Sequence, residues 1–265
     1  MKVGFVGAGR MGAPMIGRLV GAGHQVQALG RTDEKRSAVA DLGATAVSSA
    51  LAVAEGADVV IVCVFTDDQV RRVCLDDGLA AALASGSVLV LHTTGSPRTA
   101  EAIAQIAGNS GAEVLDAPVS GGPHDIAAGR VTLFVGGSDA AFERARPALA
   151  GYGDPLLHVG PLGSGQKVKL VNNTLFAAQI GLLAEAVKLG ADLGIDEGAL
   201  LGALPHGSGS SRALAGVAAR GSVASFIGTA GPFVRKDVAV VRQTVAEFGG
   251  DLGLLDALVS SGLAE

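Results

Sequence analysis

The stretch Lys2-Val3-Gly4-Phe5-Val6-Gly7-Ala8-Gly9-Arg10-Met11-Gly12 decides the fold of the N-terminal half of this chain. An apolar run typical of a buried β-strand ends at Gly7, and a helical pattern begins at Gly12. In this context Gly7 permits a tight turn, Gly9 lets the backbone approach a pyrophosphate, and Gly12 lets the helix pack close to the strand. The sequence therefore predicts a dinucleotide-binding loop whose phosphates lie at the helix N-terminus. Its residues are Gly7, Ala8, Gly9, Arg10, Met11 and Gly12.

The next 150 residues alternate short apolar runs with helical stretches. We expect strands at residues 2–7, 24–29, 58–65, 87–92, 113–117, 131–136 and 156–159. Apolar strands separated by helices are typical of a parallel sheet covered by helices on both faces. The first half of the chain is therefore predicted to be an α/β domain.

The pattern changes after Gly160-Pro161-Leu162-Gly163. Apolar residues recur at helical spacing over residues 164–194, enough for one helix of seven or more turns. Further helices are expected at 197–204, 211–219, 232–248 and 252–260, with loops at 205–210 and 228–231. We predict two domains, an α/β domain over residues 1–161 and an all-α domain over residues 162–265.

Composition excludes several classes of protein. The chain has 265 residues, of which 49% are hydrophobic and 17% charged, so disorder is not expected. A net charge of −5, with no Lys/Arg run longer than two residues, argues against nucleic acid as a partner. The longest uninterrupted apolar run, residues 59–65, is too short to span a bilayer. With no signal-peptide pattern at the N-terminus, we expect a cytoplasmic protein without a membrane partner.

The end of the second predicted strand indicates which dinucleotide binds. An NAD-binding protein usually carries an acidic residue there, which binds the ribose 2′-hydroxyl. Here the strand ends Leu29-Gly30-Arg31-Thr32, and the first acid, Asp33, comes where a helix cap would lie. Arg31 can bind a 2′-phosphate with two hydrogen bonds and Thr32 can donate a third. We therefore expect NADP to be preferred, with NAD possible.

Four motifs, in this order along the chain, carry a family resemblance. They are the glycine loop at 7–12 with Pro14 behind it, Asp116-Ala117-Pro118-Val119-Ser120-Gly121-Gly122, Gly163-Ser164-Gly165-Gln166-Lys167-Val168-Lys169-Leu170-Val171-Asn172-Asn173, and Lys236-Asp237. The chain resembles the β-hydroxyacid dehydrogenases, which include 3-hydroxyisobutyrate dehydrogenase and tartronate and succinic semialdehyde reductases. The resemblance implies a Rossmann-type doubly wound N-terminal domain, a long interdomain helix and an all-α C-terminal domain.

The resemblance also implies roles for individual residues. Lys169 matches the family's general acid/base, and no metal is expected. The substrate-binding positions are Ser120, Gly121, Gly122, Asn173 and Asp237. Besides the glycine loop, Arg31 and Thr32, the cofactor-binding positions are Val64, Phe65, Thr94 and Lys236. Leu91 and His92 stand where the family often has an acid and a methionine, and His124 and Asp125 where it has small residues.

The spacing of the predicted catalytic residues agrees with these roles. Lys169 and Asn173 are four residues apart, so a helix places them on one face, whereas Lys167 points elsewhere. An ammonium near the substrate can stabilise and then protonate the oxygen that gains charge when hydride reaches a carbonyl carbon. Taken alone, Lys169 would be interpreted as a surface lysine that extends from a helix. Its place within this motif makes the catalytic role the stronger interpretation.

We predict an NADP-dependent oxidoreductase that interconverts a small β-hydroxyacid and its semialdehyde. One alternative is an imine reductase of the same fold, whose members generally lack a lysine at position 169. Another is a non-catalytic NADP-binding scaffold protein, which the joint presence of Lys169, Asn173 and Lys236 disfavours. The expected partners are a small carboxylated aldehyde or hydroxyacid and a second copy of the chain, as a homodimer or homotetramer.

Overall fold

The chain forms two compact units, Met1–Lys169 and the residues from Leu170 onward. The structure is a computed structural model that describes residues 1–263. The first unit contains a parallel-rich sheet with helices, and the second is helical, so the predicted fold class is confirmed. The domain boundary near residue 161 stays a prediction.

The sheet of the first unit has the strand order β3-β2-β1-β4-β5-β6-β8-β7, with β9 paired to β8. From β3 to β6 all neighbours are parallel, whereas β8 joins β6 and β7 in antiparallel fashion. The strands are β1 (Lys2–Val6), β2 (Gln25–Leu29), β3 (Thr45–Val47), β4 (Val59–Val62), β5 (Val88–Leu91), β6 (Glu113–Asp116), β7 (Val119–Ser120), β8 (Val131–Gly136) and β9 (Gly153–Gly160). The order 3-2-1-4-5-6 is that of the doubly wound dinucleotide-binding sheet.

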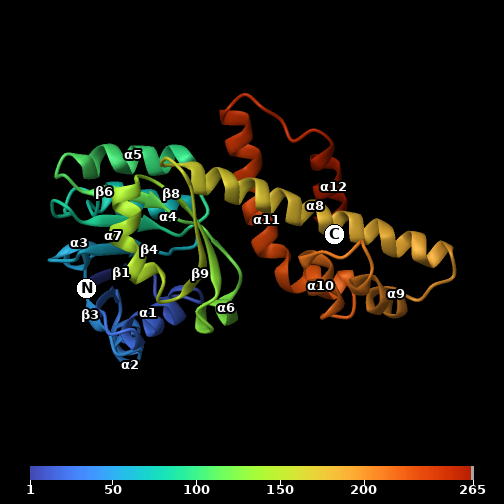
Figure 1. Cartoon of the computed structure of the whole chain (residues 1–265), viewed down its shortest axis with the longest axis horizontal. Helices are drawn as coiled ribbons and strands as arrows, with labels where there is room; N and C mark the ends of the chain where they lie inside the picture. The colour runs from blue at the N-terminus through green and yellow to red at the C-terminus, as the bar shows by residue number, and fades with distance from the viewer. Residues whose placement is uncertain (264–265) are drawn as a thin grey trace. The chain divides into compact units, whose positions relative to one another are not determined.

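Helices cover both faces of this sheet and enclose two aliphatic cores (Figure 1). One core lies under α1 (Gly12–Gly21), α2 (Asp33–Asp41), α6 (Pro123–Ala127) and α7 (Asp139–Leu149). The other lies under α3 (Ala50–Ala54), α4 (Asp67–Arg71) with its π-helical turn Arg72–Asp76, and α5 (Pro97–Gly108). Strands buried on both faces explain why β4 and β5 read as unbroken apolar runs.

The second unit is built from helices, and α8 (Ser164–Asp192) begins in the first unit and continues into it. The others are α9 (Glu197–Ala203), α10 (Arg212–Ala218), α11 (Val223–Glu247) and α12 (Leu254–Leu263), with a 3-10 turn at Leu204–His206. The predicted loop at 228–231 is wrong, because these residues lie inside α11. Two helical glycines cost about 1 kcal/mol each. A side-chain cap at Ser222 and the buried residues Val223, Val238, Val241 and Thr244 offset that cost.

Among the described helices, α8 is long and apolar enough to cross a membrane by length and composition alone. The core helix of a soluble protein passes the same criterion. Gln166, Lys169, Asn173 and Thr174 are buried polar residues of this helix.

Candidate functional site

The glycine loop has the geometry of a dinucleotide cradle. Gly7 has φ +107°, a conformation that L side chains rarely adopt, and a Cβ there would overlap the carbonyl oxygen of Cys63. A Cβ on Gly12 would overlap the carbonyl oxygen of Gly7, so strand β1 and helix α1 approach closely. By contrast, a Cβ on Gly9 would meet no protein atom within 4 Å. Gly7 and Gly12 therefore shape the loop, and the space in front of Gly9 is open.

Helix α1 begins in a way that suits an anion. Its N-cap residue, Met11, makes no side-chain capping hydrogen bond, and no acidic residue lies in the first turn. The first N–H groups and the positive end of the helix dipole are thus arranged to bind phosphate. The residues of the loop fit the pyrophosphate of a dinucleotide.

The segment after β2 carries Arg31 and Thr32, both exposed. The N-cap of α2 is Thr32, whose hydroxyl oxygen accepts a hydrogen bond from the N–H of Lys35 at 3.2 Å. The expectation that Asp33 occupies the cap position is therefore wrong, since Asp33 is the first helical residue. The Thr32 hydroxyl proton is not used by that bond and can still be donated. Arg31 Nη2 lies 3.5 Å from Asp77 Oδ2 in an exposed pair, which holds the side chain weakly.

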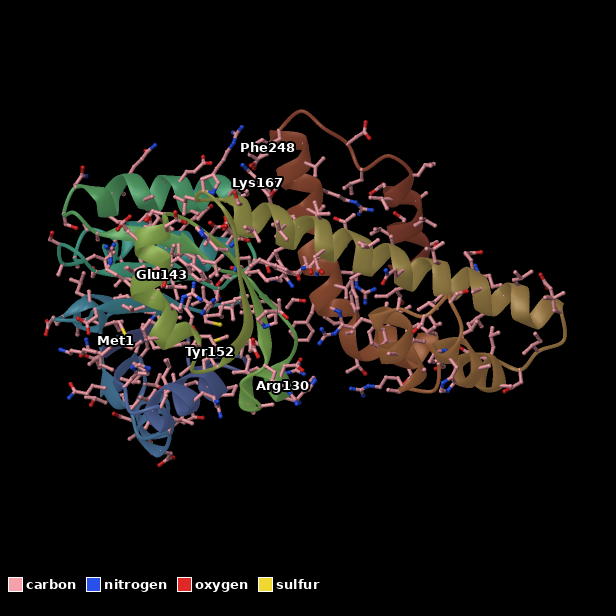
Figure 2. The ribbon with its side chains drawn as sticks, viewed as in Figure 1. Met1, Arg130, Glu143, Tyr152, Lys167 and Phe248 are labelled. Atoms are coloured by element: carbon pink, nitrogen blue, oxygen red, sulfur yellow. The ribbon has the colours of Figure 1, made fainter. Side chains whose placement is uncertain are left out.

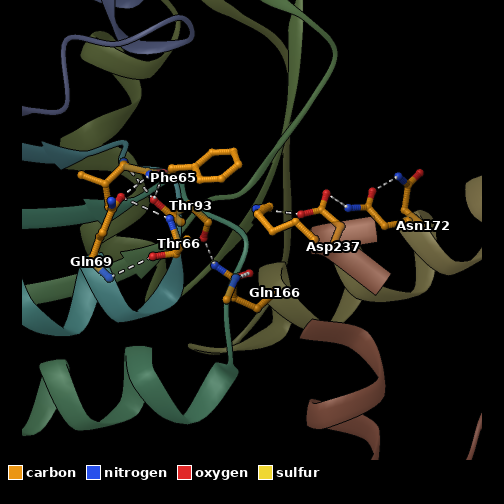
Figure 3. A network of polar contacts seen from close by, with 11 residues as sticks. Phe65, Thr66, Gln69, Thr93, Gln166, Asn172 and Asp237 are labelled. Carbon is orange, nitrogen blue, oxygen red and sulfur yellow. Dashed lines mark hydrogen bonds and ion pairs between the residues drawn. The ribbon is translucent and has the colours of Figure 1, made fainter. Parts of the chain in front are cut away.

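Strands β4 and β5 present their carboxyl ends side by side, and Thr93 links them (Figure 3). The N–H of Val64 donates to Thr93 Oγ1 at 3.0 Å, and that hydroxyl donates to the Val64 carbonyl at 2.8 Å. Phe65 is 53% exposed although it is a large aromatic residue, so its ring is accessible at this edge. Thr94, the predicted cofactor contact, is buried. Sequence reasoning missed Thr93, which fixes the position of both segments.

The predicted substrate loop follows β6 and includes the short strand β7. Gly121 has φ +135°, and a Cβ there would lie 2.7 Å from Asp125 Oδ2. Asp125 accepts the N–H of Gly122 at 2.7 Å and so closes the start of α6. The Gly122 N–H is therefore already used within the loop. His124, next to this loop, has a side chain that is 84% exposed.

Lys169 and Asn173 both lie in α8 and are each only 9% exposed, whereas Lys167 is exposed. A separation of four residues places Lys169 and Asn173 on one helix face, as the sequence predicts. Lysine is rarely buried to this extent, so its position is unusual for a purely structural side chain.

In the second unit a chain of polar contacts orients Asn173 (Figure 3). Its Nδ2 donates to Asp237 Oδ2 at 2.6 Å, and its Oδ1 accepts from Asn172 Nδ2 at 3.1 Å. Lys236 Nζ lies 2.8 Å from Asp237 Oδ1, and both of these side chains are largely buried. Lys236, Asp237 and Asn173 are thus brought together.

His92 makes a buried contact that the sequence does not indicate. Its Nδ1 lies 2.6 Å from the carbonyl oxygen of Ala117 and its Nε2 lies 2.7 Å from the hydroxyl of Tyr152. A carbonyl only accepts, so Nδ1 carries the proton and Tyr152 donates to Nε2. Burial lowers the pKa of His92 to about 4, against the opposing effect of the bond to Ala117. Figure 2 labels Tyr152 in the first unit.

Asp116, the last residue of β6, is fully buried beneath the start of α8. Its two carboxylate oxygens accept the N–H groups of Gly163 and Gln166, each at 2.6 Å. Burial raises the pKa of Asp116 to about 6, although these hydrogen bonds act in the opposite direction. Both Asp116 and Gln166 stand in the quoted motifs, but sequence reasoning gave neither a role.

Among residues 1–263 no group of three or more His, Cys, Asp or Glu side chains could hold a metal ion. The groups in place instead suit a dinucleotide, an anionic substrate and proton transfer by an amine.

Two family profiles match the chain. The one described as the NAD binding domain of 6-phosphogluconate dehydrogenase matches residues 2–160. The one described as "NAD-binding of NADP-dependent 3-hydroxyisobutyrate dehydrogenase" matches residues 163–260.

Individual proteins are similar over most of the chain. A 3-hydroxyisobutyrate dehydrogenase of Pseudomonas aeruginosa is 38% identical over 213 residues, which cover 80% of this chain and 72% of that protein. An NAD-dependent L-serine dehydrogenase of the same organism is 37% identical, with the same two coverages. The solved structure of Mycobacterium tuberculosis 3-hydroxyisobutyrate dehydrogenase with L-serine has a TM-score of 0.88 and 31% identity, and the match covers 98% of this chain and 91% of that one.

Proposed function

The chain belongs to the β-hydroxyacid dehydrogenase family of NAD(P)-dependent enzymes, and from this premise we propose that it interconverts a small β-hydroxyacid and its semialdehyde with NADP. The observation that carries the proposal is the buried Lys169 of α8, with Asn173 one turn further along the same face. Burial of an amine costs solvation free energy. A role in proton transfer to a substrate oxygen would account for its position.

The chemistry divides between the cofactor and this chain's own residues. A nicotinamide dinucleotide, which the glycine loop at residues 7–12 would hold, would supply the hydride for reduction of the semialdehyde and would accept the hydride in the oxidative direction. In the reductive direction Lys169 Nζ donates a proton to the oxygen that gains negative charge. In the oxidative direction the neutral amine accepts the hydroxyl proton. In the first unit the Ser120 hydroxyl and the Gly121 N–H bind the carboxylate. In the second unit Asp237 orients the Asn173 side chain.

NADP preference rests on the segment after β2. No acidic residue stands at Arg31 or Thr32, so the usual acceptor for a free ribose 2′-hydroxyl is missing there. A 2′-phosphate would instead meet the Arg31 guanidinium, the Thr32 hydroxyl and the N-terminus of α2.

Assembly through α8 is part of the same proposal. Four apolar residues of α8, Val171, Leu175, Leu182 and Leu189, are each more than half exposed, and their spacing places them along one stripe of the helix. Exposed apolar stripes of this kind mark association surfaces. A second copy of the chain, in a homodimer or homotetramer, is the expected occupant.

The central experiment replaces the lysine. The protein is assayed with NADPH and a panel of carboxylated aldehydes: glyoxylate and the semialdehydes of succinate, tartronate and methylmalonate. Lys169→Ala should lower turnover on the best substrate by about 10²–10⁴-fold, the usual size of a general acid/base contribution. NADPH affinity should barely change, because the glycine loop and Arg31 hold the cofactor.

Lys167→Ala is the matched control, because it removes an exposed lysine two residues away and should stay within a few-fold of the native rate. Near-native turnover in Lys169→Ala would show that the lysine is structural. A parallel loss of turnover and NADPH binding would show that it is a cofactor contact.

A further inference from the structure

The first turn of α8 lacks a side chain that could cap it. The cap position is Gly163, and the first helical bond runs from the Lys167 N–H to the Gly163 carbonyl. A glycine has no side chain that could accept the N–H groups left unpaired at the start of every helix. The two N–H groups that a capping box normally satisfies, at the cap and three residues later, belong here to Gly163 and Gln166.

Asp116 satisfies both N–H groups from another strand. One oxygen accepts from Gly163 and the other from Gln166, each at 2.6 Å, so a single carboxylate does the work of a capping box across 47 and 50 residues of sequence. A negative charge is also favoured at a helix N-terminus by the helix dipole. The carboxylate is enclosed closely: a Cβ on Gly136 would overlap Asp116 Oδ1, and a Cβ on Gly165 would lie 3.0 Å from Asp116 Oδ2.

The side chain of Gln166 makes a second attachment, to the strand next to β6. Its Nε2 donates to the Thr93 carbonyl at 2.8 Å (Figure 3), and its Oε1 accepts the Gly95 N–H at 3.0 Å. The first turn of α8 is therefore held by hydrogen bonds to the carboxyl ends of both β5 and β6. Lys169 follows Gln166 by three residues, which places the two on the same side of the helix.

We propose that Asp116 and Gln166 are positioning residues for Lys169, which they set relative to the Thr93–Gly95 segment by fixing the start of α8. This inference rests on the proposed role of Lys169 as the proton donor. Neither Asp116 nor Gln166 is assigned contact with substrate or cofactor. A displacement of about 1 Å in a catalytic group can lower a rate by about 10²-fold, so a helix start held at four hydrogen bonds matters to the rate.

The test is a double-mutant cycle between Asp116→Asn and Lys169→Ala, measured as turnover with NADPH on the best semialdehyde of the panel. Asparagine keeps the size of the side chain but turns one acceptor into a donor that faces an N–H group. Asp116→Asn alone should lower kcat by about 10–100-fold, with NADPH affinity within about three-fold of native. In the Lys169→Ala background the same substitution should change kcat less than about two-fold, because the residue acts through the lysine.

Gln166→Glu provides a second variant, since its carboxylate would face the Thr93 carbonyl. It should lower kcat when Lys169 is present and change kcat little in the Lys169→Ala background. Glu113→Gln is the control: it makes the same chemical change at the other end of β6 and should leave kcat unaltered. The fluorescence of Tyr152, the one tyrosine in a chain without tryptophan, reports whether each variant's first unit is folded.

Equal losses of kcat in the presence and absence of Lys169 would overturn the inference, since they would mean a general structural effect. Native kcat in both Asp116→Asn and Gln166→Glu, with Lys169→Ala impaired, would overturn it while leaving the proposed function intact. Native kcat in Lys169→Ala would overturn both.

Discussion

The buried His92 should make the stability of the first unit depend on pH. Its pKa is lowered to about 4 in the folded chain by burial, against 6.5 for an ordinary histidine. Between these two values the unfolded chain binds a proton that the folded chain does not, so stability falls as pH falls from 6.5 towards 4. The difference of about 2.5 pH units corresponds to about 3 kcal/mol of unfolding free energy.

The protein is unfolded in urea at several pH values between 7.5 and 4.5, and unfolding is monitored by the fluorescence of Tyr152. Because this is the only tyrosine, lies in the first unit and is fully buried, its signal reports the unfolding of that unit. The test variant is His92→Asn, which can still donate to the Ala117 carbonyl but does not titrate. It should be about 1–3 kcal/mol less stable at pH 7.5, because the Tyr152 hydroxyl loses its acceptor.

The informative quantity is how this difference changes with pH. Other carboxyl and imidazole groups act on both proteins alike, so the gap between them should narrow by up to about 3 kcal/mol as the pH falls. His124→Asn, which replaces an exposed histidine, should follow the native protein at every pH. Parallel curves for the native protein and His92→Asn would refute the reasoning, since His92 would then not be held neutral by the fold.

Three further predictions concern the cofactor loop, cofactor choice and assembly. Gly7→Ala should destabilise the fold by about 2–6 kcal/mol, because Gly7 has a positive φ and a Cβ there would overlap the Cys63 carbonyl oxygen. Gly9→Ala should keep native thermal stability and weaken NADPH binding. Lower thermal stability in both variants would contradict the inference that Gly7 shapes the loop and Gly9 leaves space for the cofactor. Native protein should have a kcat/KM tens-fold higher with NADPH than with NADH, which is the contribution of one charge-assisted hydrogen bond. Arg31→Ala should remove most of this preference and leave kcat/KM with NADH unchanged. Equal kcat/KM values with the two cofactors in native protein would refute NADP preference. Leu182→Glu on the α8 stripe should reduce the mass measured by light scattering at micromolar concentration, whereas Leu51→Glu, an equally exposed leucine on α3, should not; a native monomer would refute assembly.

Local patterns were sufficient to predict the glycine loop and the parallel strands β1, β2, β4, β5 and β6, but not the antiparallel pairing of β8 with β6 and β7. Strand β8 has the expected bounds, and α8 is one long helix, as the spacing of its apolar residues predicts. The short strands β3 and β7 were missed because two or three residues carry no detectable periodicity. The helix through 228–231 was missed because Gly and Pro dominate local reasoning, while burial decides the outcome.

Contacts between distant residues could not be predicted in the same way. His92 and Tyr152 are 60 residues apart, and Asp116 and Gln166 are 50 apart. Nothing in the residue types identifies such partners, because a buried histidine, tyrosine or aspartate can be satisfied by many groups. The motif around Asp116 and the motif around Gln166 each suggested function, but only the fold shows that they bond to each other.

The topology explains why residues so far apart in sequence serve one reaction. The glycine loop follows β1, Arg31 follows β2, Val64 follows β4, Thr94 follows β5 and Ser120 follows β6. These strands are parallel, so their carboxyl ends meet at one edge of the sheet, where ligands of open α/β sheets bind. Helix α8 follows β9, which is outside this parallel series and whose last residue, Gly160, pairs with Gly136 of β8. Asp116 and Gln166 add a direct attachment, because their hydrogen bonds tie the helix that carries Lys169 to the same edge at β5 and β6. A buried carboxylate with a raised pKa is a costly way to cap a helix, and its presence here is understandable when the position of that helix determines where a proton is delivered.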